Sequence, residues 1–147
     1  MNIPKPEPGL VIRYSYLWLS EYQAGQEEGT KDRPCGVILA LDDEDGETRV
    51  LVLPITHTPP SDPSTAVEIP LQTKQRLGLD FERSWIVLSE ANEFFWPGAD
   101  LRPIPNADPS TIAYGFLPPR LFNHVRERFV ALVKSRKAKR VTRTEQY

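Results

Sequence analysis

Residues 34–55 read PCGVILALDDEDGETRVLVLPI, and this stretch decides the fold that we expect of the 147-residue chain. It holds two continuous apolar runs, residues 34–41 and 50–55, on either side of an acidic segment with an Asp-Gly pair. Unbroken apolar runs of this length are typical of central strands buried on both faces, and Asp-Gly indicates a hairpin turn. The stretch therefore predicts two adjacent antiparallel strands. The acidic segment lacks the ligand spacing of an EF-hand loop, which favours a solvated turn over a calcium site.

Shorter strands and one helix are predicted around this hairpin. Residues 9–18 (GLVIRYSYLW) and 84–89 (SWIVLS) are rich in β-branched and aromatic residues, as strands are, and residues 66–70 form a further short strand. Near the C-terminus, one set of apolar residues falls within an arc of about 120° at helical spacing. This set is Leu121, Phe122, Val125, Phe129, Leu132 and Val133. The chain is therefore predicted to be mainly β with some α (α+β), as a small β-barrel with a C-terminal helix.

The length fits one domain, residues 1–147, and is too short for two ordinary ones. Three prolines make residues 1–8 an extended N-terminal arm. Residues 9–134 are expected to form the barrel core with its helix, and residues 19–33 within them a long loop. Residues 135–147 are expected to be a basic tail with no core to join, because a basic side chain at position 136 would project into the apolar arc.

Composition excludes several classes of protein. Apolar residues make up 39% and charged residues 26% of the chain, a balance that fits neither a disordered nor a membrane protein. The N-terminal residues lack the apolar run of a signal peptide. The single cysteine, Cys35, excludes an intramolecular disulfide and a multi-cysteine zinc site. We therefore expect a cytoplasmic protein without membrane contact, and we expect neither a metal nor another cofactor.

The net charge of −2 hides a division of charge along the chain. Residues 1–119 carry 9 Lys/Arg against 18 Asp/Glu, a balance of −9, whereas residues 120–147 carry 9 against 2, a balance of +7. Such asymmetry can indicate contact with nucleic acid or with an acidic partner. A solvated, basic helix end explains it equally well.

Two predicted strand ends carry residues suited to phosphate chemistry. Arg33 precedes Pro34 at the start of one strand, and the planar guanidinium of an arginine there can give a phosphate two charge-assisted hydrogen bonds. A surface arginine paired with a nearby carboxylate is the plainer interpretation. The other strand ends in Thr56-His57-Thr58, where hydroxyls more commonly cap a loop. His57 is either a proton-transfer group or merely exposed.

Several short motifs, in their order and spacing, resemble the MazF/PemK family of bacterial toxins, which are endoribonucleases of type II toxin–antitoxin systems. The resemblance runs from about Pro8 to Val133. Its motifs are Pro8-Gly9 before a strand, Arg33-Pro34 before an apolar VIL, Pro54-Ile55-Thr56, Leu77-Gly78-Leu79 ahead of residues 84–88, and Tyr114-Gly115-Phe116-Leu117 before the helix.

The resemblance implies a small SH3-like β-barrel that acts as a homodimer on single-stranded RNA and has a cognate antitoxin protein as its partner. The family's arginine and threonine correspond to Arg33 and Thr56, and its glutamate five residues before the arginine corresponds to Glu28. The Arg-x-Asp pair that some members have in the fourth strand corresponds to residues 88–90, where the arginine is absent and only Glu90 can serve as the acid.

The implied reaction is metal-independent attack of the ribose 2′-hydroxyl on phosphorus, which leaves a 2′,3′-cyclic phosphate. Arg33 would stabilise the charge on the phosphate, Thr56 would bind a phosphoryl oxygen or the 2′-hydroxyl, and Glu28 and His57 are the candidate base and acid. The residues expected to bind substrate beside them are Thr58 and Glu90. Two other functions stay open. A toxin of the same fold could inhibit DNA gyrase without hydrolysis, in keeping with the absent arginine, and a non-catalytic module could bind nucleic acid through the basic tail.

Overall fold

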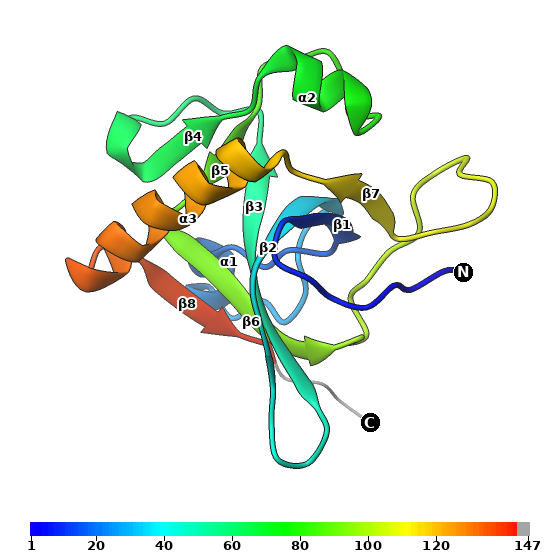
Figure 1. Cartoon of the computed structure of the whole chain (residues 1–147). Coiled ribbons are helices and arrows are strands. Elements are labelled where there is room, and N and C mark those ends of the chain that lie inside the picture. The colour runs from blue at the N-terminus through cyan, green and yellow to red at the C-terminus, as the bar shows by residue number, and fades with distance from the viewer. Residues whose placement is uncertain (144–147) are drawn as a thin grey trace.

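Two long antiparallel strands form the centre of the structure, as the sequence predicts. The structure is a computed structural model that describes residues 1–143. Strand β2 (Arg33–Asp42) pairs with β3 (Thr48–Thr56), and their hairpin extends beyond the rest of the sheet (Figure 1). Gly46, with φ of 80°, takes the left-handed conformation that the acidic turn requires. The two strand ends at residues 33 and 56 therefore meet at one edge of the molecule.

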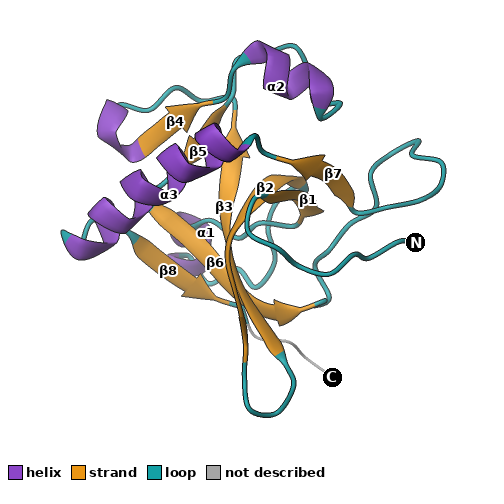
Figure 2. Ribbon diagram, in the orientation of Figure 1, coloured by secondary structure: helices purple, strands orange, loops and turns teal. Residues whose placement is uncertain are grey.

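The remaining strands extend this pair in both directions (Figure 2). Strand β1 (Leu10–Tyr14) pairs with β2, and β7 (Ala113–Phe116) pairs with β1. On its other edge, β3 pairs with β6 (Glu90–Trp96) along its first half and with β5 (Trp85–Val87) at its last two residues. The other elements are α1 (Leu19–Gln23), the 3₁₀ turn η1 (Pro63–Thr65), β4 (Ala66–Glu68), α2 (Leu71–Arg76), α3 (Pro119–Lys134) and β8 (Lys139–Thr142).

The fold class is mainly β with α-helices, as predicted, but the sheet does not close into a barrel. Its path runs β4-β5-β3-β2-β1-β7, and within residues 1–143 no pairing joins β4 to β7. The edge of β3 that faces away from β2 pairs with β6 along residues 48–52 and with β5 at residues 55–56. The two partners leave β3 at different ends, so the outer strands diverge. The sheet therefore ends in two outer strands, β4 and β7, while β2 and β3 lie at its centre.

Alternating side chains of β2 and β3 pack into two separate apolar clusters. Val50 and Val52 join the cluster on one face, whereas Leu53 and Ile55 join the cluster on the other face. Burial on both faces is what the unbroken apolar runs predict. Helix α3 covers the second cluster with Val125, Phe129 and Leu132, while Leu121 and Phe122 pack at its margin. Val133, also expected to be buried, is 49% exposed because it lies at the edge of the arc.

The prediction that residues 135–147 have no core to join is wrong for residues 139–143. Strand β8 pairs in parallel with β6, and Val141 is buried. Helix α3 ends because Arg136 adopts a φ of 61° and Lys137 N donates to Leu132 O, a reversal that returns the chain to the sheet. The basic side chains on either side of Val141 remain exposed, which is why the segment reads as a tail. Residues 144–147 lie outside the described part of the chain.

Two further segments bear on the sequence predictions. The arm of residues 1–8 is extended, and Trp96 Nε1 donates to Pro4 O at 3.1 Å, which holds the arm against β6. The loop predicted over residues 19–33 begins with α1, whose start is capped by a hydrogen bond from Trp18 N to Glu21 Oε1. None of the helices in residues 1–143 is long and apolar enough to cross a membrane.

Candidate functional site

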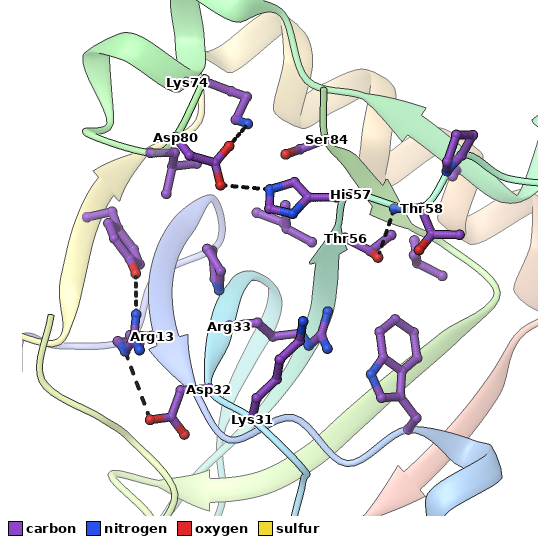
Figure 3. A pocket seen from close by; sticks show the side chains of 18 of the residues that line it. Arg13, Lys31, Asp32, Arg33, Thr56, His57, Thr58, Lys74, Asp80 and Ser84 are labelled. Atoms are coloured by element: carbon purple, nitrogen blue, oxygen red, sulfur yellow. Dashed lines mark hydrogen bonds and ion pairs between the residues drawn. The ribbon is translucent and has the colours of Figure 1, made fainter. Parts of the chain in front are cut away.

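A cavity of about 840 Å³ opens at the edge where β2 begins and β3 ends (Figure 3). The β2–β3 register, which pairs Cys35 with Pro54, places Arg33 opposite Thr56 when it is continued by two residues. The loop of residues 57–65 forms one wall and is stiffened by prolines. The polar side chains around the cavity are Arg13, Lys31, Asp32, Arg33, Thr56, His57, Thr58, Ser61, Thr65, Lys74, Asp80, Ser84 and Tyr114.

Arg33 lines this cavity without a hydrogen-bond or ion-pair partner for its guanidinium among residues 1–143. The guanidinium lies 4.9 Å from the centre of the Trp18 ring, which orients it by a cation–π contact. Its Nε is buried and unpaired, and an unmet donor of this kind costs free energy. Lys31, which Figure 3 shows beside the cavity with Arg33, also has no hydrogen bond or ion pair within the described residues. The two side chains thus offer unneutralised positive charge.

The alternative interpretation, in which Arg33 pairs with a nearby carboxylate, does not occur among residues 1–143. The adjacent carboxylate of Asp32 instead lies 4.0 Å from Arg13 Nε and 3.7 Å from Arg102 Nε. Arg13 also donates to the Tyr114 hydroxyl at 3.4 Å. Asp32 is therefore balanced by two other arginines, and Arg33 keeps its charge for a ligand.

His57 is held between two carboxylates on the opposite wall. Its Nε2 lies 2.7 Å from Asp80 Oδ2 and its Nδ1 lies 3.1 Å from Glu82 Oε2. Carboxylate oxygens only accept hydrogen bonds when ionised, so a ring protonated on both nitrogens satisfies both contacts. Lys74, whose side chain is 2% exposed, donates to Asp80 Oδ1 and to Glu82 O. The imidazole is thereby fixed in position at the cavity.

The charge of Asp80 follows from these contacts. Partial burial by itself would raise the pKa of the Asp80 carboxyl, but hydrogen bonds from Lys74 and His57 outweigh it and lower the pKa. Asp80 is accordingly ionised at neutral pH, and it is the partner that holds the His57 ring. The contact also balances Lys74, a lysine that could not otherwise be buried at low cost.

Two hydroxyls lie beside these groups. Thr56 Oγ1 accepts a hydrogen bond from Thr58 N at 3.2 Å, so the Thr56 hydroxyl proton is free to be donated to a ligand. Thr58 also lines the cavity and is exposed. Thr56 therefore caps its loop, which the sequence left open, and it does so as an acceptor, so its own hydroxyl hydrogen remains available. The site therefore combines unpaired cations, a hydroxyl donor and a fixed imidazole.

The structure brings together four of the six residues named from the sequence and leaves two apart. Arg33, Thr56, His57 and Thr58 line one cavity, whereas Glu28 and Glu90 do not. Glu28 is exposed in the loop that follows α1.

Glu90 has a different position from the one expected of a substrate-binding residue. It begins β6, which pairs with the far half of β3, and its Oε1 accepts hydrogen bonds from Leu19 N at 2.9 Å and the Tyr16 hydroxyl at 3.1 Å. Burial raises the pKa of its carboxyl, and those two hydrogen bonds only partly offset that effect. Glu90 therefore holds the start of α1 against the sheet.

Several cavity residues carry no clear signal in the sequence. Lys74 belongs to a short polar helix and reads as solvent-exposed, yet it is among the most buried side chains. Asp80 belongs to a polar loop whose path local pattern does not specify. Arg13 gives the one usable signal, since it is a charged residue inside an otherwise apolar strand.

His57, Asp80 and Glu82 form the one group of three close metal-ligating side chains in residues 1–143, and all three are exposed. The Lys74 ammonium already supplies positive charge to this group through Asp80. A cation would have to displace or oppose that ammonium, so the donor set does not favour a metal.

The fold and the site together define a small, mainly β protein with a cationic cavity where β2 begins and β3 ends. A search against models of known protein families and a search of curated proteins both find no significant match. The interpretation of the site therefore depends on its own geometry and on the short motifs described above.

Proposed function

We propose that this protein is an endoribonuclease that cleaves single-stranded RNA by metal-independent transesterification, and that it is the toxin of a bacterial toxin–antitoxin pair. The observation that carries the proposal is the unpaired Arg33 guanidinium in one cavity with the Thr56 hydroxyl, at the end of the central hairpin. The motifs that resemble the MazF/PemK family include both residues, which supports the same reaction class.

The reaction places added negative charge on phosphorus as the 2′-oxygen attacks. Arg33 and Lys31 are the groups suited to hold that charge, because neither spends its own charge on a partner within residues 1–143. Thr56 donates its hydroxyl proton to a phosphoryl oxygen. Charged donors already in place stabilise the transition state more than the ground state, which is the condition for faster chemistry.

Two protons must also move during cleavage. His57, held between Asp80 and Glu82, is suited to give its proton to the departing 5′-oxygen. The base must take the 2′-hydroxyl proton, and only Asp32 and Asp80 supply carboxylates to the cavity wall within the described chain. Asp80 is held by hydrogen bonds from Lys74 and His57, whereas Asp32 lies 3.7–4.0 Å from the nearest arginine nitrogens and accepts no side-chain hydrogen bond within residues 1–143. We therefore assign the base to Asp32, in place of Glu28.

The same proposal includes the partners and the location. We propose that the protein acts in the cytoplasm as a homodimer and that an antitoxin protein binds it. Residues 1–119 carry a balance of −9, so RNA must be held locally at the cationic cavity. Residues 120–147, with a balance of +7, complement an acidic antitoxin segment. Complex formation should weaken as salt is added, and binding that is independent of salt would contradict this part.

The test is incubation of the purified protein with end-labelled single-stranded RNA in the presence of a metal chelator. We expect fragments that end in a 2′,3′-cyclic phosphate, and no cleavage of the same sequence as DNA, because the attacking 2′-hydroxyl is absent. Intact RNA under these conditions would refute the proposal. Intact RNA together with capture of DNA gyrase would favour the non-hydrolytic toxin, and RNA that is bound but uncut would favour the nucleic-acid-binding module.

A further inference from the structure

The loop of residues 24–32, which joins α1 to β2, carries two of the charged side chains at the cavity. Lys31 and Asp32 line the cavity, and Arg33 follows them as the first residue of β2 (Figure 3). The loop is polar and largely exposed, and none of its residues belongs to the two apolar clusters. Its position therefore depends on contacts other than apolar packing.

Glu21 of α1 supplies such contacts with both of its carboxylate oxygens. Its Oε1 accepts a hydrogen bond from Trp18 N at 3.0 Å, and its Oε2 accepts a hydrogen bond from the Thr30 hydroxyl. Partial burial by itself would raise the pKa of the Glu21 carboxyl, but the hydrogen bonds from Thr30 and Trp18 outweigh it and lower the pKa. Glu21 is thus ionised at neutral pH, and it joins the residue before α1 to the residue before Lys31.

The loop has a second point of attachment at Gly29. A Cβ atom at this position would overlap Tyr16 O, so the loop can approach the chain after β1 this closely only with a glycine. Gly29 is held by this close approach and Thr30 by its hydrogen bond to Glu21. Two successive residues are therefore anchored directly before Lys31.

Both unpaired cations of the cavity adjoin the residues that Glu21 holds. The Arg33 guanidinium lies 4.9 Å from the centre of the Trp18 ring, and Trp18 N donates to Glu21. Lys31 follows Thr30 directly in the chain. The charge of Arg33 also contributes to the lowered pKa of Glu21. By its charge alone, Glu21 therefore weakens the attraction of this site for a phosphate.

We propose that Glu21 is a positioning residue that holds the Arg33 guanidinium and the Lys31 ammonium where they bind the RNA backbone. It acts through Trp18 and Thr30. The inference rests on the proposed function, since it takes the phosphates of single-stranded RNA as the ligand. Charge and position have opposite consequences here. Loss of a negative charge near the site should strengthen the binding of a polyanion, whereas loss of the positioning contacts should weaken it.

The experiment compares two substitutions at Thr30, one without and one with a hydroxyl. Thr30→Val removes the hydrogen bond to Glu21 and keeps the shape of the side chain, whereas Thr30→Ser keeps the hydroxyl. Glu21→Ala removes both hydrogen bonds. Its matched control is Glu27→Ala, because Glu27 is an exposed glutamate of the same loop that contacts Arg143 through its carbonyl oxygen and not through its carboxylate.

Binding is measured by fluorescence anisotropy at several salt concentrations, with a labelled single-stranded RNA made uncleavable by 2′-fluoro substitution. We expect Thr30→Val to weaken binding about tenfold, the scale of one hydrogen bond to a charged group, and Glu21→Ala to weaken it at least as much. In Thr30→Val the slope of log affinity against log salt should fall by about one, because one phosphate contact is lost. Thr30→Ser should bind as wild type does, and Glu27→Ala should bind equally or slightly more tightly.

A double variant tests whether Thr30 acts through Lys31. Lys31→Ala should weaken binding and lower the salt slope as Thr30→Val does, and the two substitutions together should cause no further loss. The melting temperature of Thr30→Val should stay close to that of wild type, because Thr30 is exposed. A further loss in the double variant would refute action through Lys31.

Cleavage of the matching natural RNA separates this inference from the proposed function. If wild type cleaves RNA but Thr30→Val binds as tightly as wild type, or Glu21→Ala binds more tightly, the positioning role is refuted and the nuclease stands. If wild type binds without cleaving and Thr30→Val loses affinity as described, the positioning role stands and the nuclease is refuted. If wild type neither binds nor cleaves RNA, both are refuted.

Discussion

Arg33 and Arg143 differ sharply in how their guanidinium groups are used. Arg143 is 4% exposed and donates to Ser15 O at 2.7 Å and to Asp100 Oδ2 at 3.0 Å, with further bonds to a tyrosine hydroxyl and an asparagine. Arg33 rests on Trp18 and has a buried Nε with no hydrogen-bond partner in the described part of the chain. A paired, buried arginine stabilises the fold, whereas an unpaired one costs free energy and is available for a ligand. We therefore expect Arg143 and strand β8 to matter for stability, and Arg33 and the cavity to matter for function.

The largest effect should come from breaking the paired arginine. We expect Arg143→Ala to lower the free energy of unfolding by about 3–5 kcal/mol, because Asp100 loses its closest cation while it stays largely buried. Urea denaturation measures the change. Lys139→Ala, an exposed position in the same strand, is the matched control and should be nearly neutral. A loss below about 1 kcal/mol for Arg143→Ala would show that β8 contributes little to the fold.

Substitution of the unpaired Arg33 should affect activity strongly and stability only slightly. We expect Arg33→Ala to lower the RNA cleavage rate by about 10²–10³-fold, the usual effect of removing one preorganised donor from a transition state. Its free energy of unfolding should change by less than about 1 kcal/mol, since only the contact with Trp18 is lost.

The control for this variant is Arg49→Ala, which removes an exposed arginine over Phe95 at the far end of β3. Both variants are compared in the cleavage assay and in urea denaturation. Equal cleavage by Arg33→Ala and wild type would refute the role of Arg33. A large loss of stability in Arg33→Ala would refute the distinction between the two arginines.

The same contrast explains what the sequence could predict. Strands β2 and β3 were predictable because burial on both faces requires continuous apolar runs, and Arg33 and Thr56 were predictable as candidate residues because they end those strands. Strand β8 was not predictable, because Val141 is its only apolar residue and the burial of Arg143 depends on partners in distant segments. Local sequence pattern predicts which apolar side chains are buried, but it does not predict which charged side chains are buried.

Lys74 and Asp80 illustrate the same limit at the cavity. A buried lysine is stable only beside a carboxylate that the fold brings to it, and the loop that delivers Asp80 has no periodicity to read. Glu28 shows the converse limit, since its spacing from Arg33 suggested a place beside that residue, whereas the structure leaves it exposed and outside the cavity lining. Where the path of a loop decides a residue's position, the sequence therefore missed residues that line the cavity and suggested one that does not.

A smaller effect is expected where the chain turns from α3 into β8. Arg136 adopts a φ of 61°, a conformation that costs a non-glycine residue free energy. Arg136→Gly should therefore raise the free energy of unfolding by up to about 1 kcal/mol. Thermal unfolding measures the shift, with the adjacent Lys137→Gly as the control that should gain nothing. A lower melting temperature for Arg136→Gly would mean that the arginine side chain stabilises this turn.

The smallest effect concerns Glu90, which lies beside β8 and is expected to matter for stability alone. Burial raises the pKa of its carboxyl, so the folded chain binds its proton more tightly than the unfolded chain does. The stability of wild type should then fall as the pH rises through the folded pKa of Glu90. In Glu90→Gln the amide oxygen can still accept the bonds from Leu19 N and Tyr16, and the group no longer titrates. Urea denaturation at several pH values should show that the free energy of unfolding of Glu90→Gln rises relative to that of wild type as the pH rises. RNA cleavage should be unchanged. A difference in stability that stays constant with pH would refute the raised pKa of Glu90, and a loss of cleavage would refute the assignment of Glu90 to stability alone.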